Sequence, residues 1–187
     1  MRKKMLVVGL ISLGCFIAPV NGFAEVEKTS DVNFSIDPGT LSLEQVTSFS
    51  FGTSRIGDIA LGQQELDAAA NQESLIYDFR GENESGWRLT AKLSKLTNEV
   101  GDELTGQVHL KGSKGSETTA ALVSEAVLEA GIEEPTAISS ADGKTGLGPN
   151  SFDFSETTLT IPQQNVNSGE YKGTITWTLE DTYQPSI

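Results

Sequence analysis

The sequence has almost none of the residues that build disulfides, metal centres or nucleophilic catalytic sites. Among its 187 residues there is one cysteine, Cys15, and one histidine, His109. Cys15 falls within an apolar N-terminal run, and without that run the chain can form neither a disulfide nor a His/Cys metal site. A Ser/His/acid triad would need His109, which alternation places on the solvent side of a strand. A carboxylate pair is the one catalytic arrangement that the composition allows, and we expect no cofactor.

Long apolar runs are also missing, except at the N-terminus. Arg2, Lys3 and Lys4 precede an apolar stretch over residues 5–20, and small residues follow at 22 and 24. This order predicts a secretory signal peptide, residues 1–24, cleaved after Ala24. Acylation of Cys15 is the alternative, which the apolar residues after it disfavour. The run is shorter than the about 20 residues of a membrane span, so we expect no span in the mature chain.

Positive charge is scarce. The chain has 13 Lys and Arg against 26 Asp and Glu, a formal net charge of −13. Removing the signal peptide leaves 10 basic residues and a net charge of −16. Such a chain is not expected to bind nucleic acid, and it gains nothing electrostatically from anionic lipid or wall phosphate. Binding to an acidic surface would have to use hydrogen bonds, stacking, a bridging cation or a protein partner.

What the sequence has in quantity is short stretches of alternating apolar and polar residues, which are typical of half-buried strands. Residues 118–131 also fit a helical spacing, but the surrounding pattern favours strands there too. The fold class predicted is all-β: a single antiparallel β-sandwich or barrel-like domain over residues 32–187, after a linker at 25–31. The predicted strands are residues 32–36, 41–43, 48–51, 74–80, 87–94, 104–110, 159–161 and 171–180, with a turn at 37–39.

Two segments depart from this pattern. Residues 63–72 contain an alanine run and are the best helix candidate. Residues 141–151 are rich in glycine and predict a flexible loop, since Gly143-Lys144-Thr145 lacks the strand–loop–helix context of a phosphate-binding loop. Calcium could be bound there by Asp142, Asp153 and loop carbonyl groups, although the usual spacing of acidic ligands is absent.

The two tryptophans of the chain occur in one repeated pattern, Trp87-Arg88-Leu89 and Trp177-Thr178-Leu179. In a strand, residues two apart share a face, so each motif places an indole beside a leucine. One interpretation is that both indoles belong to the core. The other is that they form a platform for a sugar ring or a protein. The candidate binding residues are Trp87, Leu89, Tyr171, Trp177 and Leu179.

Residues 170–185, with Tyr171, the Ile175-Thr176-Trp177-Thr178-Leu179 block and Pro185, resemble the C-terminal signature of the WxL domain family. Gly86-Trp87-Arg88-Leu89-Thr90 is similar to the first motif of that family. Residues 38–43 and 49–53 are similar to its N-terminal opening. The resemblance covers about residues 31–187.

The resemblance implies a secreted, non-catalytic protein on the surface of a Gram-positive bacterium. Such a protein is held non-covalently on the cell wall, associates with peptidoglycan, acts alongside WxL-interacting surface proteins and can contact host matrix proteins. The printed sequence has no LPXTG-type sorting sequence, which agrees with this expectation. Two alternatives stay open: an adhesion module that reaches the wall only through a protein partner, and a wall hydrolase.

Overall fold

The computed structural model describes Ser30 and residues 32–37, 39–70, 72–81 and 85–182. The chain divides into two units, Met1–Ser35 and Ile36–Ile187. The predicted signal peptide, Cys15 and nearly all of the predicted linker lie outside the described residues, so cleavage after Ala24 stays a prediction. No helix in the described part of the chain is long and apolar enough to cross a membrane.

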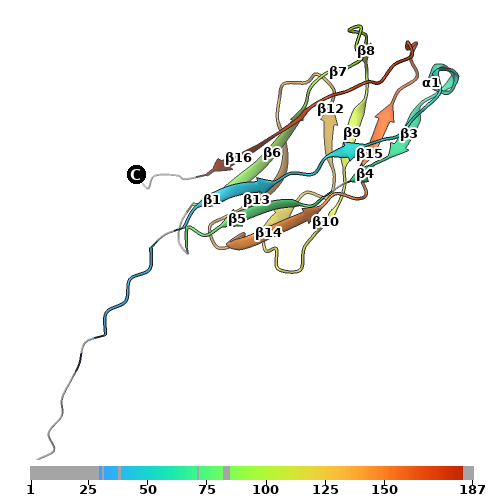
Figure 1. The fold of residues 1–187 in the computed structure, drawn as a ribbon. Coiled ribbons are helices and arrows are strands. Elements are labelled where there is room, and N and C mark those ends of the chain that lie inside the picture. Colours follow the sequence, from blue (N-terminus) through green and yellow to red (C-terminus); the bar gives the residue numbers. More distant parts are fainter. Residues whose placement is uncertain (1–29, 31, 38, 71, 82–84, 183–187) are drawn as a thin grey trace, which may run out of the picture. The chain divides into compact units, whose positions relative to one another are not determined.

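The first layer of the β-sandwich consists of two four-stranded sheets and one short strand pair (Figure 1). One sheet has the strand order β1-β5-β14-β10, and the other has the order β12-β9-β15-β3. The short pair is β2-β4. The bounds are β1 (Leu41–Gln45), β2 (Phe49–Ser50), β3 (Gln64–Asp67), β4 (Ala69–Ala70), β5 (Ser74–Asp78), β9 (Gln107–Leu110), β10 (Ser113–Lys114), β12 (Ala126–Glu129), β14 (Gly148–Asp153) and β15 (Thr158–Ile161).

The second layer has the order β11-β13-β6-β16. Alternate residues of β6 point into the core, and Trp87, Leu89, Ala91 and Leu93 are at most 4% exposed. Both layers end in edge strands within the described residues, which confirms the sandwich and not the barrel. The bounds are β11 (Ala121–Leu122), β13 (Thr136–Ala141), β6 (Trp87–Leu93) and β16 (Ile175–Asp181), with a separate pair formed by β7 (Leu96–Thr97) and β8 (Glu103–Leu104).

Most of the predicted strands are confirmed, including the ambiguous segment 118–131, which contains β11 and β12. The predicted helix at 63–72 is wrong, because this segment forms β3 and β4. Leu66 pairs with Leu159 of β15, and the Ala68 N–H donates to the Thr157 carbonyl. Strand pairing and the inward-facing Leu66 therefore outweigh the helix propensity of the alanines. The helix found is α1 (Ile56–Leu61), with Ile59 buried.

Three further predictions need correction. Residues 32–36 form no strand, although their alternation suits one. The glycine-rich loop is shorter than predicted, because residues 148–151 already pair with β5 as part of β14. The last strand begins at Ile175 and not at Tyr171; before it, Lys172 forms only an isolated bridge with Thr97.

Trp87 lies at one end of the β6–β16 pair, next to a glycine that the fold needs. A Cβ atom on Gly86 would lie 2.0 Å from the carbonyl oxygen of Ala141, at the end of β13. The Gly86 carbonyl also accepts a hydrogen bond from the Thr182 N–H at 3.0 Å. Glycine at this position therefore lets β13 and the end of β16 approach the start of β6.

A buried ionic cluster holds the same end of the sandwich. The Arg80 guanidinium donates to both carboxylate oxygens of Asp78, at 2.9 and 2.8 Å, and its Nη1 lies 2.9 Å from Asp181. It also donates to the Ser85 carbonyl at 2.8 Å. Asp78 is only 2% exposed, and its hydrogen bond raises the pKa of Arg80 further above its ordinary value. The cluster ties the end of β5 to the end of β16.

We expect Gly86→Ala to lower the free energy of unfolding by about 2 kcal/mol, because the added methyl group overlaps the Ala141 carbonyl. Gly57→Ala, inside α1 with no atom within 4 Å of its Cβ position, is the control and should be neutral or stabilising. Urea unfolding followed by circular dichroism measures both. Equal effects would contradict the role given to Gly86.

We expect Arg80→Met to cost about 3 kcal/mol, because it leaves the Asp78 carboxylate buried without its partner. The double variant Asp78→Asn/Arg80→Met should be more stable than Arg80→Met alone, since no unpaired charge remains. Chemical denaturation of both variants provides the comparison. A double variant less stable than Arg80→Met would show that the cluster does not act as a charge pair.

Candidate functional site

The two Trp-x-Leu motifs lie on neighbouring antiparallel strands, β6 and β16. Leu179 is directly opposite Leu89, Trp177 is opposite Ala91, and Asp181 is opposite Trp87. The two leucines therefore form a cross-strand pair between the two indoles. This register places all four side chains on the inner face of the second layer.

Trp87 and Leu89 are core residues, each with 0% of its surface exposed. The Trp87 Nε1–H donates to the Gly146 carbonyl at 3.4 Å. Gly146 has a φ of +74°, and a Cβ atom there would lie 2.9 Å from Trp87 Nε1 and 2.4 Å from Ala141 Cβ. The glycine-rich loop therefore covers the edge of the Trp87 indole, and only glycine fits at its closest point.

The same loop is held by Asp142. Its Oδ1 accepts hydrogen bonds from the N–H groups of Thr145 and Lys144 and from the Thr145 hydroxyl. These bonds, that of the Thr145 N–H first, lower the pKa of Asp142 below its ordinary value. Asp153, the other predicted calcium ligand, accepts from the Ser155 N–H. Within the described residues, no three His, Cys, Asp or Glu side chains come together as a metal site.

Trp177, Tyr171 and Leu179 differ from the first motif because they are only half-buried. The Trp177 indole packs on Phe154, with ring centroids 5.7 Å apart and a 37° angle between the planes. The Tyr171 hydroxyl donates to the Asn167 carbonyl at 3.2 Å. Trp177 and Tyr171 line one large cleft, whereas Leu179 lies in a shallower groove beside Leu41 and Leu43.

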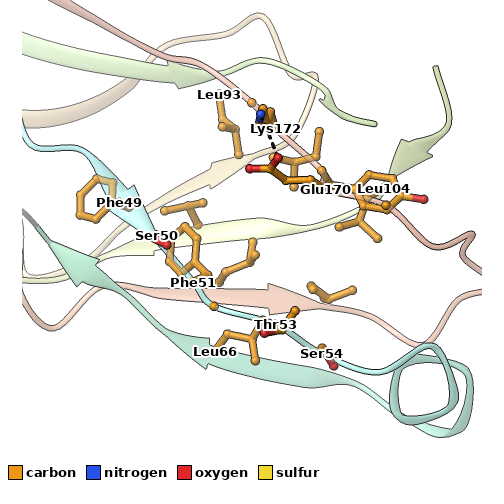
Figure 2. A pocket seen from close by; sticks show the side chains of 18 of the residues that line it. Phe49, Ser50, Phe51, Thr53, Ser54, Leu66, Leu93, Leu104, Glu170 and Lys172 are labelled. Atoms are coloured by element: carbon orange, nitrogen blue, oxygen red, sulfur yellow. Dashed lines mark ion pairs between the residues drawn. The ribbon is translucent and has the colours of Figure 1, made fainter. Parts of the chain in front are cut away.

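The large cleft has a volume of about 960 Å³ and lies between residues 46–54 on one side and 166–175 on the other. Figure 2 shows Phe49 and Phe51 on the first wall and the Glu170–Lys172 ion pair on the second. The two phenylalanine rings stack at 6.2 Å, and the ion pair closes at 2.9 Å. The floor is formed by core side chains: Leu93, Leu96, Leu104, Val108, Leu159 and Ile161.

Each wall of the cleft continues into an edge strand. Among the described residues, β2 pairs only with β4, and β16 pairs only with β6. The cleft is thus the open side of the sandwich, where the two layers part and core side chains line the gap. The alternation of Phe49 and Phe51 with Ser48 and Ser50 predicts the strand but gives no sign that it borders a cleft.

The outer faces of the two layers differ in charge. On the outer face of β6 and β16, Lys92 is opposite Thr176, Thr90 is opposite Thr178, and Arg88 is opposite Glu180. Arg88 approaches Glu180 at 3.4 Å, and Lys92 approaches Glu133 at 2.7 Å. This hydroxyl-bearing surface, which we call the threonine face, therefore has its charges in opposite pairs.

The outer face of β3, β15, β9 and β12 is acidic by comparison. It presents Glu65, Asp67 and Glu129. His109 lies on this face, partly exposed as predicted, with Nδ1 2.7 Å from Glu125. The hydrogen bond to His109 lowers the pKa of Glu125, and Lys111 lies 3.5 Å from the same carboxylate.

The family model described as "WxL domain surface cell wall-binding" matches residues 17–182 of this chain. No curated protein and no solved structure matches this chain. Because the match covers most of the sequence and both Trp-x-Leu strands, the chain belongs to the WxL domain family of cell-wall-binding surface proteins.

Proposed function

We propose that this chain is a non-catalytic module that attaches to the peptidoglycan of a Gram-positive bacterium through its threonine face. The match to a family of wall-binding surface domains is the observation that carries the proposal. The predicted signal peptide supplies the route of export. Retention on the wall is non-covalent in this proposal.

The chemistry of the threonine face supports its choice as the contact surface. Peptidoglycan presents sugar hydroxyls, amides and carboxylates. Threonine hydroxyls both donate and accept hydrogen bonds, and Thr176 and Thr178 are exposed. A chain with a net charge of −13 is repelled by an anionic polymer unless its contact surface is locally balanced. The paired Arg88 and Lys92 give this face that balance. On the opposite layer, Glu65, Asp67 and Glu129 form no ion pair within the described part of the chain.

In this proposal the five motif residues have different tasks. Trp87 and Leu89 are buried, so they act by keeping β6 flat and in register beside β16, which aligns the threonines on the other side. Leu179 continues that packing. Trp177 and Tyr171 line the cleft and are available to a second binding partner.

A second candidate function is attachment through another protein. The observation that favours it is the cleft between two edge strands, because an extended segment can pair with a free sheet edge and place its side chains in the gap. The partners would be WxL-interacting surface proteins or host matrix proteins. A wall hydrolase, the third alternative, is supported by no geometric feature described above.

We expect the protein, starting at Glu25, to sediment with purified peptidoglycan sacculi, and Thr176→Glu/Thr178→Glu to bind about tenfold more weakly. Two added carboxylates on the contact surface are repelled by the polymer, and a tenfold loss corresponds to about 1.4 kcal/mol. Gln107→Glu/Val127→Glu adds the same charge to the outer face of β9 and β12 and should bind like the wild type. Melting curves check that all variants are folded.

The same assay distinguishes the alternatives. Binding that resists salt and chelator supports direct hydrogen bonding, whereas loss on chelation would introduce a bridging cation. A folded wild type that does not sediment with partner-free sacculi, but is captured with a surface protein of the same cells, would contradict direct attachment. Clearing of the sacculus suspension would contradict the non-catalytic assignment.

We expect Trp87→Ala to lower the free energy of unfolding by about 4 kcal/mol, because it empties a fully buried site. Trp177→Ala should cost less than half as much, since the indole borders the cleft, and the folded variant should still sediment with sacculi. Denaturant titration and the sedimentation assay test the pair. If a folded Trp177→Ala variant failed to bind sacculi, the wall contact would have to lie in the cleft and not on the threonine face.

A further inference from the structure

Strand β16, at one edge of the second layer, is longer and more regular than the other edge strands of the described chain (Figure 1). It has seven residues without a proline, it pairs with β6 without a register shift, and its charged residues are its last two, Glu180 and Asp181. By contrast, β1 is interrupted by a register shift between Leu43 and Gln45, and β2, β10 and β11 have two residues each. Short length and irregular register protect edge strands from pairing with another chain, and β16 has neither.

The backbone bonds of this segment show which residues direct their polar groups away from β6. Lys172 exchanges two hydrogen bonds with Thr97, both at 2.9 Å, and the Thr174 carbonyl accepts one from the Ser94 N–H at 2.9 Å. In an antiparallel pair, residues bonded to the neighbouring strand alternate with residues whose N–H and C=O groups point the other way. The even-numbered residues from 172 onward therefore face β6 and β7. The residues directed away from them are Gly173, Ile175, Trp177 and Leu179.

The charges along this edge are complementary to those of a second copy running antiparallel. If Thr176 lies opposite Thr176 of the second copy, Lys172 lies opposite Glu180 of the second copy, and the reverse pair forms on the other side. Within each copy, Lys172 also contacts Glu170 at 2.9 Å and Glu180 contacts Arg88 at 3.4 Å. The four side chains would then form a row of alternating charge across the contact, and opposite charges on facing strands stabilise their pairing.

The side chains between the charges also match. In the same register, Thr174 lies opposite Thr178 on the outer face, and both are exposed. On the inner face, Ile175 lies opposite Trp177, and both are only half-buried in a single copy. The residues directed away from β6 meet one another, as hydrogen bonding between the two strands requires. Hydrogen bonds, apolar contact and charge therefore favour one and the same register.

We propose that two copies of this chain form a dimer in which their β16 strands pair antiparallel about a two-fold axis at Thr176. A two-fold contact uses the same surface of both copies, so the assembly closes at two. The second layers of the two copies become one continuous sheet. Because the axis is perpendicular to that sheet, both threonine faces point in the same direction. If the proposed function holds, on which this consequence rests, one dimer contacts the wall polymer at two points.

A disulfide experiment tests both the contact and its register. The chain starting at Glu25 contains no cysteine. Residues opposite each other in a non-hydrogen-bonded pair have Cα atoms about 4.5 Å apart, a separation that a disulfide can span. We expect Thr176→Cys to form a covalent dimer under mild oxidation, measured by non-reducing electrophoresis. Thr178→Cys is the matched control on the same face. Its two copies lie about 13 Å apart along the strands, so it should react at least tenfold more slowly. Equal rates would overturn the proposed register.

A charge exchange tests the contact without a covalent bond. Lys172→Glu and Glu180→Lys each place like charges opposite each other twice in the dimer. We expect each single variant to weaken the dimer about tenfold in sedimentation velocity. Lys172→Glu/Glu180→Lys restores opposite charges and should dimerise within about threefold of the wild type. A double variant weaker than either single variant would contradict the pairing, since a purely structural role of the two residues predicts additive losses.

A backbone variant separates the dimer from wall attachment. Ile175→Pro removes an N–H directed at the second copy, at a position where an edge strand tolerates proline, and should be monomeric. Ile175→Ala shortens the same side chain but keeps the N–H, and it should still dimerise. Both retain Thr176 and Thr178, so Ile175→Pro should still sediment with sacculi. The Thr176→Glu/Thr178→Glu comparison is made in this monomeric background, so that a loss of wall contact is not confused with a loss of the dimer.

The two proposals fail in different ways. A wild type that remains monomeric at the highest concentration tested would overturn the dimer, and sedimentation of that monomer with sacculi would leave the proposed function intact. A dimer that passes the disulfide and charge tests but does not sediment with sacculi would contradict the proposed function alone.

Discussion

The structure depends most on the register between β6 and β16. These strands are the longest of their layer, and Leu89 opposite Leu179 fixes their alignment. A shift of one residue would turn Trp87 and its neighbours outward and the threonines inward. The Arg80 cluster and Gly86 hold one end of the pair, and the glycine-rich loop closes over Trp87. The packing of the core and the arrangement of side chains on the outer face therefore both depend on the register between β6 and β16.

This alignment explains how a buried motif can matter for a surface activity. The tryptophan and leucine of the first motif have no exposed surface, yet Arg88 between them is exposed on the outer face. In a strand, the inner residues determine where the outer residues project. The proposed wall contact and the cleft thus lie on opposite sides of the same two strands, and each can be occupied without the other.

Much of the fold could be predicted from period-two alternation, because half-buried antiparallel strands leave that pattern in the sequence. The apolar faces of residues 87–94 and 104–110 are buried as predicted. The helix at 63–72 was predicted from alanine content, which is also compatible with a strand when a partner such as β15 supplies hydrogen bonds. The strand at 32–36 was predicted from alternation alone, and these residues form no strand.

The candidate site was only partly predictable for a related reason. The Trp-x-Leu pattern identified the two strands, but burial separates Trp87 from Trp177, and burial depends on neighbours such as Gly146 and Phe154 that lie far away in the sequence. The cleft is formed where two edge strands fail to meet. The gap between these two strands leaves no pattern in the local sequence. The sequence therefore predicts a strand at Phe49 and Phe51, but not that these residues line a cleft.

The most direct test of the central claim is a nuclear magnetic resonance titration with soluble peptidoglycan fragments, observing threonine and leucine methyl groups. The account predicts shifts at Thr176 and Thr178, which are exposed on the outer face, with the cleft residues Leu93 and Leu104 unchanged. Shifts confined to the cleft, or a folded protein with no shifts at saturating fragment, would contradict wall attachment through the threonine face.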